Sequence, residues 1–478
     1  MTKNLLKNYI FIALISFLFL VYNFYFDQGY WYDEWATLLS SDPRVTTNEI
    51  FLRINGIYEG KYWLGSEENV PSYYYLLLRF FFSLFGFTTE NGRLFSIIFF
   101  ILTVLIFSIL SRNILGKKNH YFAILILSLN PLLLWMANET RVDTFALFFS
   151  TLNVYLFFKS IQNNKKKYFI FLTLSNLVML SVYPLTFSIF FSQIFFLFCK
   201  KFIFKNIDKK IFISYILIFV LSFILYLILN YEYLALKFFF QRPFYVKLQE
   251  EFFFSFFFNI FFGNKYFGAI YLLLFLILLI KNLKNIFINE IILFLSIVIF
   301  STYSMVVVSS LYFTPIASPR YIIFIIPILI LWLIKNIFIT EKIIIKKIVI
   351  YSLIIVPIVN ILFTNNDRPV KKPPIKEALH IIQDNNTKNI YVPYSKYYYL
   401  YISRMGDVVN NKYKLINNRD IYSTNIKKFA HLCLNNPRFR VGNLILSDEK
   451  ECNTRFNNYN VEKIIKINDF IITFFQIK

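Results

Sequence analysis

Charged residues are scarce in this chain of 478 residues, where they make up 16% of the sequence against 57% hydrophobic and 21% aromatic residues. An assembly of soluble domains carries more charge, so the composition excludes one for most of the chain. The 61 Phe and 34 Tyr residues likewise exclude intrinsic disorder, which needs a chain poor in aromatics. Long apolar runs separated by short lysine-rich segments indicate a polytopic membrane protein.

Cysteine is almost absent as well, with three residues in the whole chain. Three cysteines give no framework of disulfides and no zinc-binding pattern. Cys433 and Cys452 both lie in the polar C-terminal segment. An oxidising compartment would permit a bridge between them, although we expect two free thiols. The chain also lacks an internal repeat, which argues against a transporter built from two related halves.

Acidic residues are outnumbered, 27 against 50 Lys and Arg, which gives a formal net charge of +23. Such an excess would suit a nucleic-acid partner if the lysines gathered on one surface. They instead recur in five blocks between apolar runs, a pattern typical of cytoplasmic loops. We therefore expect no nucleic-acid partner. The blocks are Arg112, Lys117 and Lys118; Lys159 and 165–167; Lys200, Lys201, Lys205, Lys209 and Lys210; Lys281 and Lys284; and Lys335, Lys342, Lys346 and Lys347.

Eleven apolar segments are expected to cross the membrane. The first, residues 10–26, follows Lys3 and Lys7 and has no small-residue cleavage site, so we expect an uncleaved helix with a cytoplasmic N-terminus. Residues 168–199 are too long for one pass and are divided by Pro184. Because the count is odd, the C-terminal segment is expected outside. The later spans are 91–111, 120–137, 141–158, 168–183, 185–199, 211–230, 266–280, 287–309, 320–334 and 343–363.

A shorter apolar segment, residues 73–86, has Arg79 in its middle. If it crossed, every later lysine block would lie outside and an arginine would be buried in lipid. We therefore expect an interfacial or re-entrant segment on the external side. Residues 231–262, with a dense run of Phe, are expected to form another external loop with an amphipathic helix on the membrane surface.

Two domains follow from this pattern. Residues 1–363 are expected to form a mainly α transmembrane bundle, with residues 27–90 as its first external loop. Residues 364–478 are expected to form a small extracytoplasmic α/β domain. Within this domain the residue patterns predict a helix at 375–383 and strands at 389–393, 441–447 and 469–475.

The strongest candidate site is the sequence Trp31-Tyr32-Asp33-Glu34, shortly after the first apolar segment. Two adjacent carboxylates in an aromatic setting near lipid are costly to desolvate unless they bind a ligand or transfer protons. A carboxylate there is suited to act as general base toward an acceptor hydroxyl or amine. The aromatic rings are suited to stack on a sugar. A solvated acidic loop with interfacial aromatics is the alternative.

A second candidate is the external turn that contains Glu139, Arg141 and Asp143. If the turn is helical, Glu139 and Asp143 share one face and repel, so a cationic or hydrogen-bonding partner is expected. The alternative is that Asp143 caps the helix that begins there. Tyr183, directly before Pro184, closes another external turn, and either lines the same cavity or marks a kink.

A third candidate is Arg320, which follows Ser318-Pro319 where a late span begins on the external side. An arginine next to a helix N-terminus is suited to bind a phosphate. A snorkelling interfacial arginine is the alternative. Arg93 and Arg141 are further candidates. Acids and arginines from distant positions thus gather at one membrane face, as a site for a lipid-linked phosphosugar requires.

The ordered set of these segments resembles the GT-C membrane glycosyltransferases. Within them it is similar to the bacterial group related to dolichyl-phosphate-mannose–protein mannosyltransferases and the lipid A aminoarabinose transferase. Relatives often carry a basic residue or histidine and two prolines where this chain has Val70-Pro71-Ser72. The donor-lipid contacts of the relatives are therefore not carried over to this segment. The resemblance covers about residues 8–363 and depends on Asp33-Glu34, residues 70–78 with Arg93-Leu94, residues 138–143 and residues 318–321.

This resemblance implies an inverting glycosyltransferase of the plasma membrane that uses a polyprenyl-phosphate sugar on the extracytoplasmic face. It implies that Asp33 is the base, with Glu34 beside it, and that Asp143 is the second acid. The residues expected to bind the donor phosphate are Arg320, Arg141 and Arg93. The residues expected to line the sugar and the acceptor are Trp31, Tyr32, Tyr73, Glu139 and Tyr183.

The expected partners are the polyprenyl-phosphate sugar donor, a lipid, glycan or protein acceptor, and membrane lipids. No cofactor is expected to be required, although paired acids also suit a divalent cation. Two alternatives stay open. An O-antigen ligase or polymerase would place arginines and a histidine in a late external loop, whereas His120, His380 and His431 lie elsewhere. A lipid or glycan transporter would place charges at mid-membrane, and the spans carry almost none.

Overall fold

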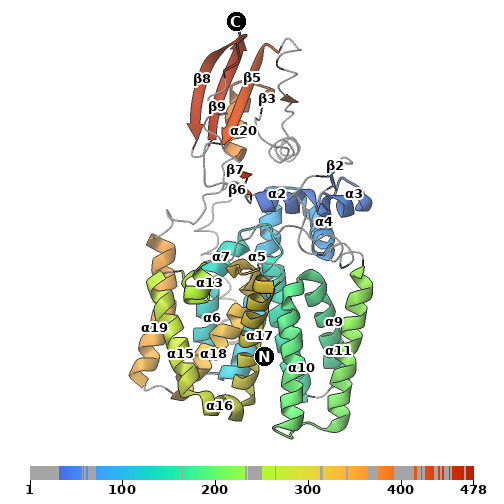
Figure 1. The fold of residues 1–478 in the computed structure, drawn as a ribbon, viewed down its shortest axis with the longest axis vertical. Coiled ribbons are helices and arrows are strands. Elements are labelled where there is room, and N and C mark those ends of the chain that lie inside the picture. The colour runs from blue at the N-terminus through green and yellow to red at the C-terminus, as the bar shows by residue number, and fades with distance from the viewer. Residues whose placement is uncertain are drawn as a thin grey trace. The chain divides into compact units, whose positions relative to one another are not determined.

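The computed structural model shows two compact units (Figure 1). The helical unit consists of the described residues from 93 to 363, and the mixed unit consists of those from 32 to 92 and from 375 to 478. The residues that the structure describes are 32–55, 57–58, 61–62, 71–163, 165–231, 234, 250–263, 265–312, 316–340, 343–363, 375–391, 414–416, 421, 426–434, 440–441, 444–445, 452, 455–467 and 470–478. The first predicted span, residues 10–26, lies outside them.

Helices build the whole helical unit, and their ends follow the polar breaks in the sequence. Asp208, for example, caps α11 because its Oδ1 accepts a hydrogen bond from the Lys210 amide at 2.6 Å. The helices are α5 (Thr89–Leu115), α6 (His120–Ser128), α7 (Pro131–Ala137), α8 (Asp143–Asn163), α9 (Lys166–Val182), η1 (Pro184–Thr186), α10 (Phe187–Phe202), α11 (Lys209–Leu229), α13 (Glu250–Ser255), α14 (Phe258–Phe261), α15 (Lys265–Lys281), α16 (Leu283–Ile288), α17 (Glu290–Tyr312), η2 (Pro319–Ile325), α18 (Ile326–Thr340) and α19 (Ile343–Phe363).

Six of these helical segments are long and apolar enough to cross a bilayer, among the residues that are described. The chain is therefore a polytopic membrane protein. Each of the ten later predicted spans coincides with a helix or a helix pair, although α9 and α15 have only 17 residues each. The total of eleven spans stays a prediction. The six segments are α5, α8, η1 with α10, α11, α17, and η2 with α18.

The span predicted at 120–137 is broken in its middle. The chain forms two short helices there, α6 and α7, whose axes differ by 55°. Asn130 and Pro131 cause the break, because Asn130 has an extended backbone and caps α7 while Pro131 occupies its first position. Counted as one broken span, the pair would raise the number of candidate spans to seven.

The spans differ in how deeply they are buried. The most apolar window of η2 with α18 is 83% buried, whereas that of α11 is 22% buried. α18 therefore lies at the centre of the helical unit and α11 at its margin, where its leucines and isoleucines are exposed. Buried amides join three consecutive spans: Asn153 of α8 donates to Asn176 of α9 at 2.7 Å, and Gln193 of α10 donates to Asn153 at 2.6 Å. Such bonds hold helices together in lipid, where apolar side chains give little driving force.

Three helices and a short hairpin build the first part of the mixed unit: α2 (Tyr32–Leu39), α3 (Thr47–Ile54), β1 (Ile57–Tyr58) with β2 (Lys61–Tyr62), and α4 (Tyr73–Phe85). With 13 residues, α4 is too short to cross a bilayer. One of its faces exposes Leu77, Phe80 and Leu84, as a helix in a membrane interface does. The segment predicted to be interfacial or re-entrant is therefore a short helix with an exposed apolar face.

A five-stranded mixed sheet with the strand order β4-β3-β5-β9-β8 forms the rest of the mixed unit. β3 pairs in parallel with β4 and β5, whereas β9 pairs antiparallel with β5 and β8. The amphipathic helix α20 (Ile375–Asp384) contacts the sheet at β9. The strands are β3 (Asn389–Tyr391), β4 (Lys414–Ile416), β5 (Lys428–Leu434), β8 (Tyr459–Ile467) and β9 (Phe470–Ile477), and a separate pair is formed by β6 (Arg440–Val441) and β7 (Leu444–Ile445).

Two expectations for this C-terminal part need correction. Cys433 and Cys452 are not free thiols, because they form a disulfide with their Cα atoms 5.4 Å apart. The predicted strand at 441–447 is divided into the short pair of β6 and β7, which stands apart from the main sheet. In addition, β5 and β8 were not predicted, although they pair with β9 over most of their length.

Candidate active site

Two carboxylates are buried where α7 turns into α8. Glu139 is 1% exposed, and Asp143, the first residue of α8, is 4% exposed. The backbone between them is not helical, and the Arg141 amide donates to the Glu139 carbonyl at 2.8 Å. The two acids therefore do not stand one helical turn apart. Asp143 lies at the positive end of α8, where its charge is favoured.

Arg320 is the cation that both acids share. Its Nη2 atom lies 3.5 Å from Glu139 Oε2 and 3.8 Å from Asp143 Oδ2. η2 supplies this side chain, because the helix begins at Pro319, and α8 packs against η2. The cationic partner predicted for the two acids is therefore present. Both distances exceed the usual 2.7–3.2 Å of an N–H···O hydrogen bond, and the Arg320 side chain keeps 20% of its surface exposed.

Tyr183 lies beside this cluster. It is 4% exposed, and its ring makes an edge contact with Phe324, with ring centroids 6.3 Å apart. Its hydroxyl interacts electrostatically with Asp143 and Arg320, and also with Tyr321 and Arg141. Within the described part of the chain that hydroxyl has no hydrogen-bond partner. The structure thus brings Tyr183 and the turn of α7 and α8 to the same place as Arg320.

Arg93 is also buried, with 4% of its surface exposed, in the first turns of α5. Two residues later, Phe95 stacks on Phe145 of α8, with ring centroids 6.2 Å apart. This part of α5 therefore packs against the helix that begins with Asp143. Binding of the donor phosphate by Arg93 stays a prediction.

The other candidate residues belong to the mixed unit. Asp33 and Tyr32 form the start of α2, but only their backbone is described, and Trp31 lies outside the described residues. Glu34 is 0% exposed, which contradicts the alternative of a solvated acidic loop at this residue. Tyr73 begins α4 and is half-buried, and this burial raises the pKa of its hydroxyl.

Sequence reasoning missed two residues that hold these elements in place. Asn130 caps α7 and also donates its side-chain amide to the carbonyl of Phe261 at 2.7 Å. Arg53 is 1% exposed and contacts both α2 and Asp42. The Asn-Pro pair at 130 and 131 was the available signal for the first, because it favours the start of a turn. The one signal for Arg53 is Glu49, four residues earlier on α3.

A family model supports the resemblance seen in the sequence. Residues 69–229 match the model of the dolichyl-phosphate-mannose-protein mannosyltransferases. The matched segment runs from the start of α4 to the end of α11 and includes Glu139, Asp143 and Tyr183. Arg320 lies beyond it.

Solved structures extend the likeness to nearly the whole chain. The chain is similar to ArnT from Cupriavidus metallidurans, both bound to undecaprenyl phosphate and in the apo state. Each comparison has a TM-score of 0.56 and 10% identity, and covers 99% of this chain and 98% of that chain. The protein therefore has the fold of these ArnT structures over nearly its whole length. A sequence search among curated proteins finds no match.

Proposed function

We propose that this protein is an integral membrane glycosyltransferase that moves a sugar from a polyprenyl-phosphate donor to an acceptor on the extracytoplasmic face. The observation that carries the proposal is the shared contact of Arg320 with Glu139 and Asp143. It joins the turn of α7 and α8 to the start of η2 inside a helix bundle of the ArnT type. The ArnT structure with undecaprenyl phosphate supports a donor of the same class.

In this proposal Arg320 balances the charge of the leaving phosphate. The guanidinium lies 3.5 Å from one carboxylate and 3.8 Å from the other, and charge-assisted hydrogen bonds would attract an incoming phosphate anion to it. Phosphate becomes a workable leaving group when its developing charge is compensated in a poorly solvated site. Glu139 and Asp143 then orient the arginine, and Tyr183, whose buried hydroxyl has no partner among the described residues, is suited to donate a hydrogen bond to the sugar or phosphate.

Asp33 is the proposed base. It takes the proton of the acceptor hydroxyl or amine while the acceptor atom bonds to the anomeric carbon and the bond from that carbon to the phosphate oxygen breaks. The electrons of that bond leave with the polyprenyl phosphate, and the configuration at the anomeric carbon inverts. Asp33 lies in the first turn of α2.

Two observations support an extracytoplasmic site. The turns that join α5 to α6, α8 to α9 and α10 to α11 carry or border lysine blocks and lie at one end of the helical unit, whereas the turns that join α7 to α8 and α9 to α10 lie at the other (Figure 1). By the positive-inside rule, this arrangement supports an external candidate site. The disulfide of Cys433 and Cys452 further suits an oxidising compartment for the C-terminal part of the mixed unit.

Transfer of label from a polyprenyl-phosphate sugar tests the proposal. Membranes with the wild type, Asp33→Asn or Glu462→Gln are given undecaprenyl-phosphate donors labelled in mannose or in aminoarabinose, with and without EDTA. Glu462 is an exposed carboxylate on β8 and serves as the control. We expect transfer to fall at least 100-fold in Asp33→Asn alone, the scale typical of a lost general base, and to persist in EDTA. Equal transfer by Asp33→Asn and the wild type would refute the base assignment.

A further inference from the structure

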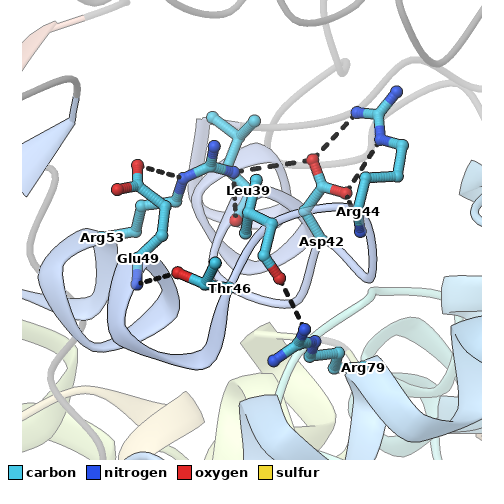
Figure 2. Close-up of polar contacts among 8 residues, drawn as sticks. Leu39, Asp42, Arg44, Thr46, Glu49, Arg53 and Arg79 are labelled. Carbon is cyan, nitrogen blue, oxygen red and sulfur yellow. Dashed lines mark hydrogen bonds and ion pairs between the residues drawn. The ribbon is translucent and has the colours of Figure 1, made fainter.

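A buried charged network lies directly after α2 (Figure 2). Asp42 and Arg53 are each 1% exposed, which is rare for charged residues unless they are paired. Arg53 Nη1 lies 3.6 Å from Asp42 Oδ2, and Arg53 Nε lies 3.2 Å from Glu49 Oε1. Arg44 adds two side-chain hydrogen bonds to Asp42 at 2.9 Å each. These four side chains form a compensated set of two acids and two arginines.

Arg53 also completes the end of α2. The last carbonyls of a helix have no partner inside it. In α2 the carbonyls of Ala36 and Leu38 accept from the backbone amides of Ser40 and Ser41, while the Leu39 carbonyl accepts from Arg53 Nη1 at 2.9 Å. A cation at this end is also favoured by the helix dipole. Arg53 of α3 therefore caps α2 with both a hydrogen bond and a charge.

α2 needs such support because it is only eight residues long. Isolated helices of that length are unstable in water, so tertiary contacts decide whether α2 holds its shape. The described side chains of α2, from Glu34 to Leu39, are all buried. Asp33 and Glu34 occupy its first turn, two turns from the end that Arg53 caps.

Asp42 keeps the network charged. Burial alone would raise the pKa of its carboxyl group, but the hydrogen bonds from Arg44 and the charges of Arg44 and Arg53 outweigh burial, and the pKa is lowered. Asp42 is thus a permanent anion beside Arg53. It fixes the guanidinium in the orientation that reaches Leu39.

We infer that Arg53 is a positioning residue for glycosyl transfer, which caps α2 and thereby fixes the helix whose first turn carries Asp33. This inference rests on the proposed function, because it acts through Asp33. A shift of about 1 Å in a catalytic group is enough to lower a rate 100-fold. The effect should fall on the rate of transfer rather than on donor affinity, because Arg53 donates its hydrogen bond to α2, the helix that carries the proposed base.

Arg79 provides a matched control. It is another arginine of the mixed unit whose guanidinium donates to Thr47 Oγ1 at 2.9 Å and to the Val45 carbonyl. These two hydrogen bonds join α4 to Val45 and to Thr47, the first residue of α3, and do not involve the end of α2. Replacing either arginine by lysine keeps the charge and removes the planar fork that makes such bonds.

The test compares Arg53→Lys, Asp42→Asn and Arg79→Lys in the full-length protein in detergent, with undecaprenyl-phosphate mannose and aminoarabinose as donors. We expect kcat to fall about 10-fold in Arg53→Lys and less in Asp42→Asn, with the donor KM unchanged within twofold, and Arg79→Lys to retain the wild-type kcat. Hydrogen exchange should quicken at residues 34–41 in Arg53→Lys, to a smaller extent in Asp42→Asn, and not in Arg79→Lys, which reports the loosened helix even without turnover.

The outcomes are distinct. An unchanged kcat in Arg53→Lys together with faster exchange in α2 would overturn the inference, because the helix end would then not control the base. Equal losses in Arg53→Lys and Arg79→Lys would overturn it too, as the sign of general destabilisation. Asp33→Asn is assayed in parallel. If it retains full transfer, the base assignment of the proposed function fails, and the positioning role fails with it. If Asp33→Asn loses transfer while Arg53→Lys keeps the wild-type kcat, only the positioning role fails.

Discussion

Asn130 and Phe261 are joined by a hydrogen bond across 131 positions of the chain, from the Asn130 side-chain amide to the Phe261 carbonyl at 2.7 Å. The other side-chain atom of Asn130 is used locally, because its Oδ1 accepts from the Leu133 amide at 3.1 Å and caps α7. Asn130 therefore lies at the bend between α6 and α7 and also joins the start of α7 to α14 by a hydrogen bond. Six residues after Leu133, the chain reaches Glu139.

Asn130→Ser separates these two roles. Serine retains the cap of α7 but is too short to reach Phe261, so a buried carbonyl loses its donor. We expect the free energy of unfolding to fall by about 1 kcal/mol, a typical size for such a bond within a membrane protein. Thermal unfolding in detergent measures the change, and Asn163→Ser, which removes an exposed amide at the end of α8, is the control. A loss of equal size in both variants would contradict the proposed role of Asn130.

Arg320→Gln tests the central ion cluster. The change leaves Glu139 and Asp143 buried without the cation they share, so we expect the free energy of unfolding to fall by roughly 2–4 kcal/mol. We also expect the variant to lose donor-dependent transfer. The double variant Arg320→Gln with Glu139→Gln removes one of the two carboxylate charges. We expect it to regain at least half of the lost stability and none of the transfer, as measured by detergent unfolding and labelled-donor assays. Recovery of transfer in the double variant would show that Arg320 serves packing alone.

The membrane helices were predictable because apolar runs of adequate length and flanking lysines follow directly from the cost of exposing polar groups to lipid. α19 begins and ends where the sequence predicts, at residues 343 and 363. The bend at Asn130 was missed because hydropathy averages over a window and carries no direction. β8 was missed because its sequence does not alternate regularly between apolar and polar residues. Glu462 and Lys463 interrupt the alternation in this exposed edge strand.

The candidate site shows the same limit. The predicted topology alone puts Glu139, Tyr183 and Arg320 at one membrane face. Each lies in a turn or at the start of a span on the side opposite the lysine blocks. That Arg320 pairs with both acids depends on the rotation of η2 against α8, which no sequence pattern encodes. Arg53 and Asp42 lie within residues 27–90, the predicted first external loop, yet they form a buried pair. The sequence alone does not distinguish a solvated charge in such a loop from a buried one.

The disulfide predicts a dependence on reductant. Cys433 and Cys452 close a loop with a sequence separation of 19, and opening such a loop removes about 3 kcal/mol by the chain-entropy estimate. We expect Cys433→Ser, or dithiothreitol with the wild type, to lower the stability of the C-terminal sheet by about that amount. Alkylation under denaturing conditions should label one thiol before reduction and three after it, because Cys199 is the free cysteine. Three labelled thiols without reductant would refute the bridge.

His431 predicts a loss of stability in acid. It is 1% exposed on β5, within about 6 Å of the rings of Tyr391, Phe456 and Phe475, and burial lowers its pKa to about 4. Since an unfolded histidine has a pKa near 6.5, the unfolded chain binds the extra proton between those values, and unfolding becomes easier as pH falls. The stabilisation is complete above about pH 6.5 and is lost by about pH 4.

The loss should amount to roughly 3 kcal/mol over this window, at 1.36 kcal/mol for each pKa unit. Denaturant unfolding of the full chain in detergent at several pH values, followed by hydrogen exchange at residues 428–434, measures it. His431→Phe cannot take up the proton and should make β5 insensitive to pH in this range, whereas His380→Gln, at an exposed position of α20, should retain the wild-type slope. If His431→Phe keeps the full pH dependence, the acid sensitivity belongs to other groups and the buried neutral histidine is not its cause.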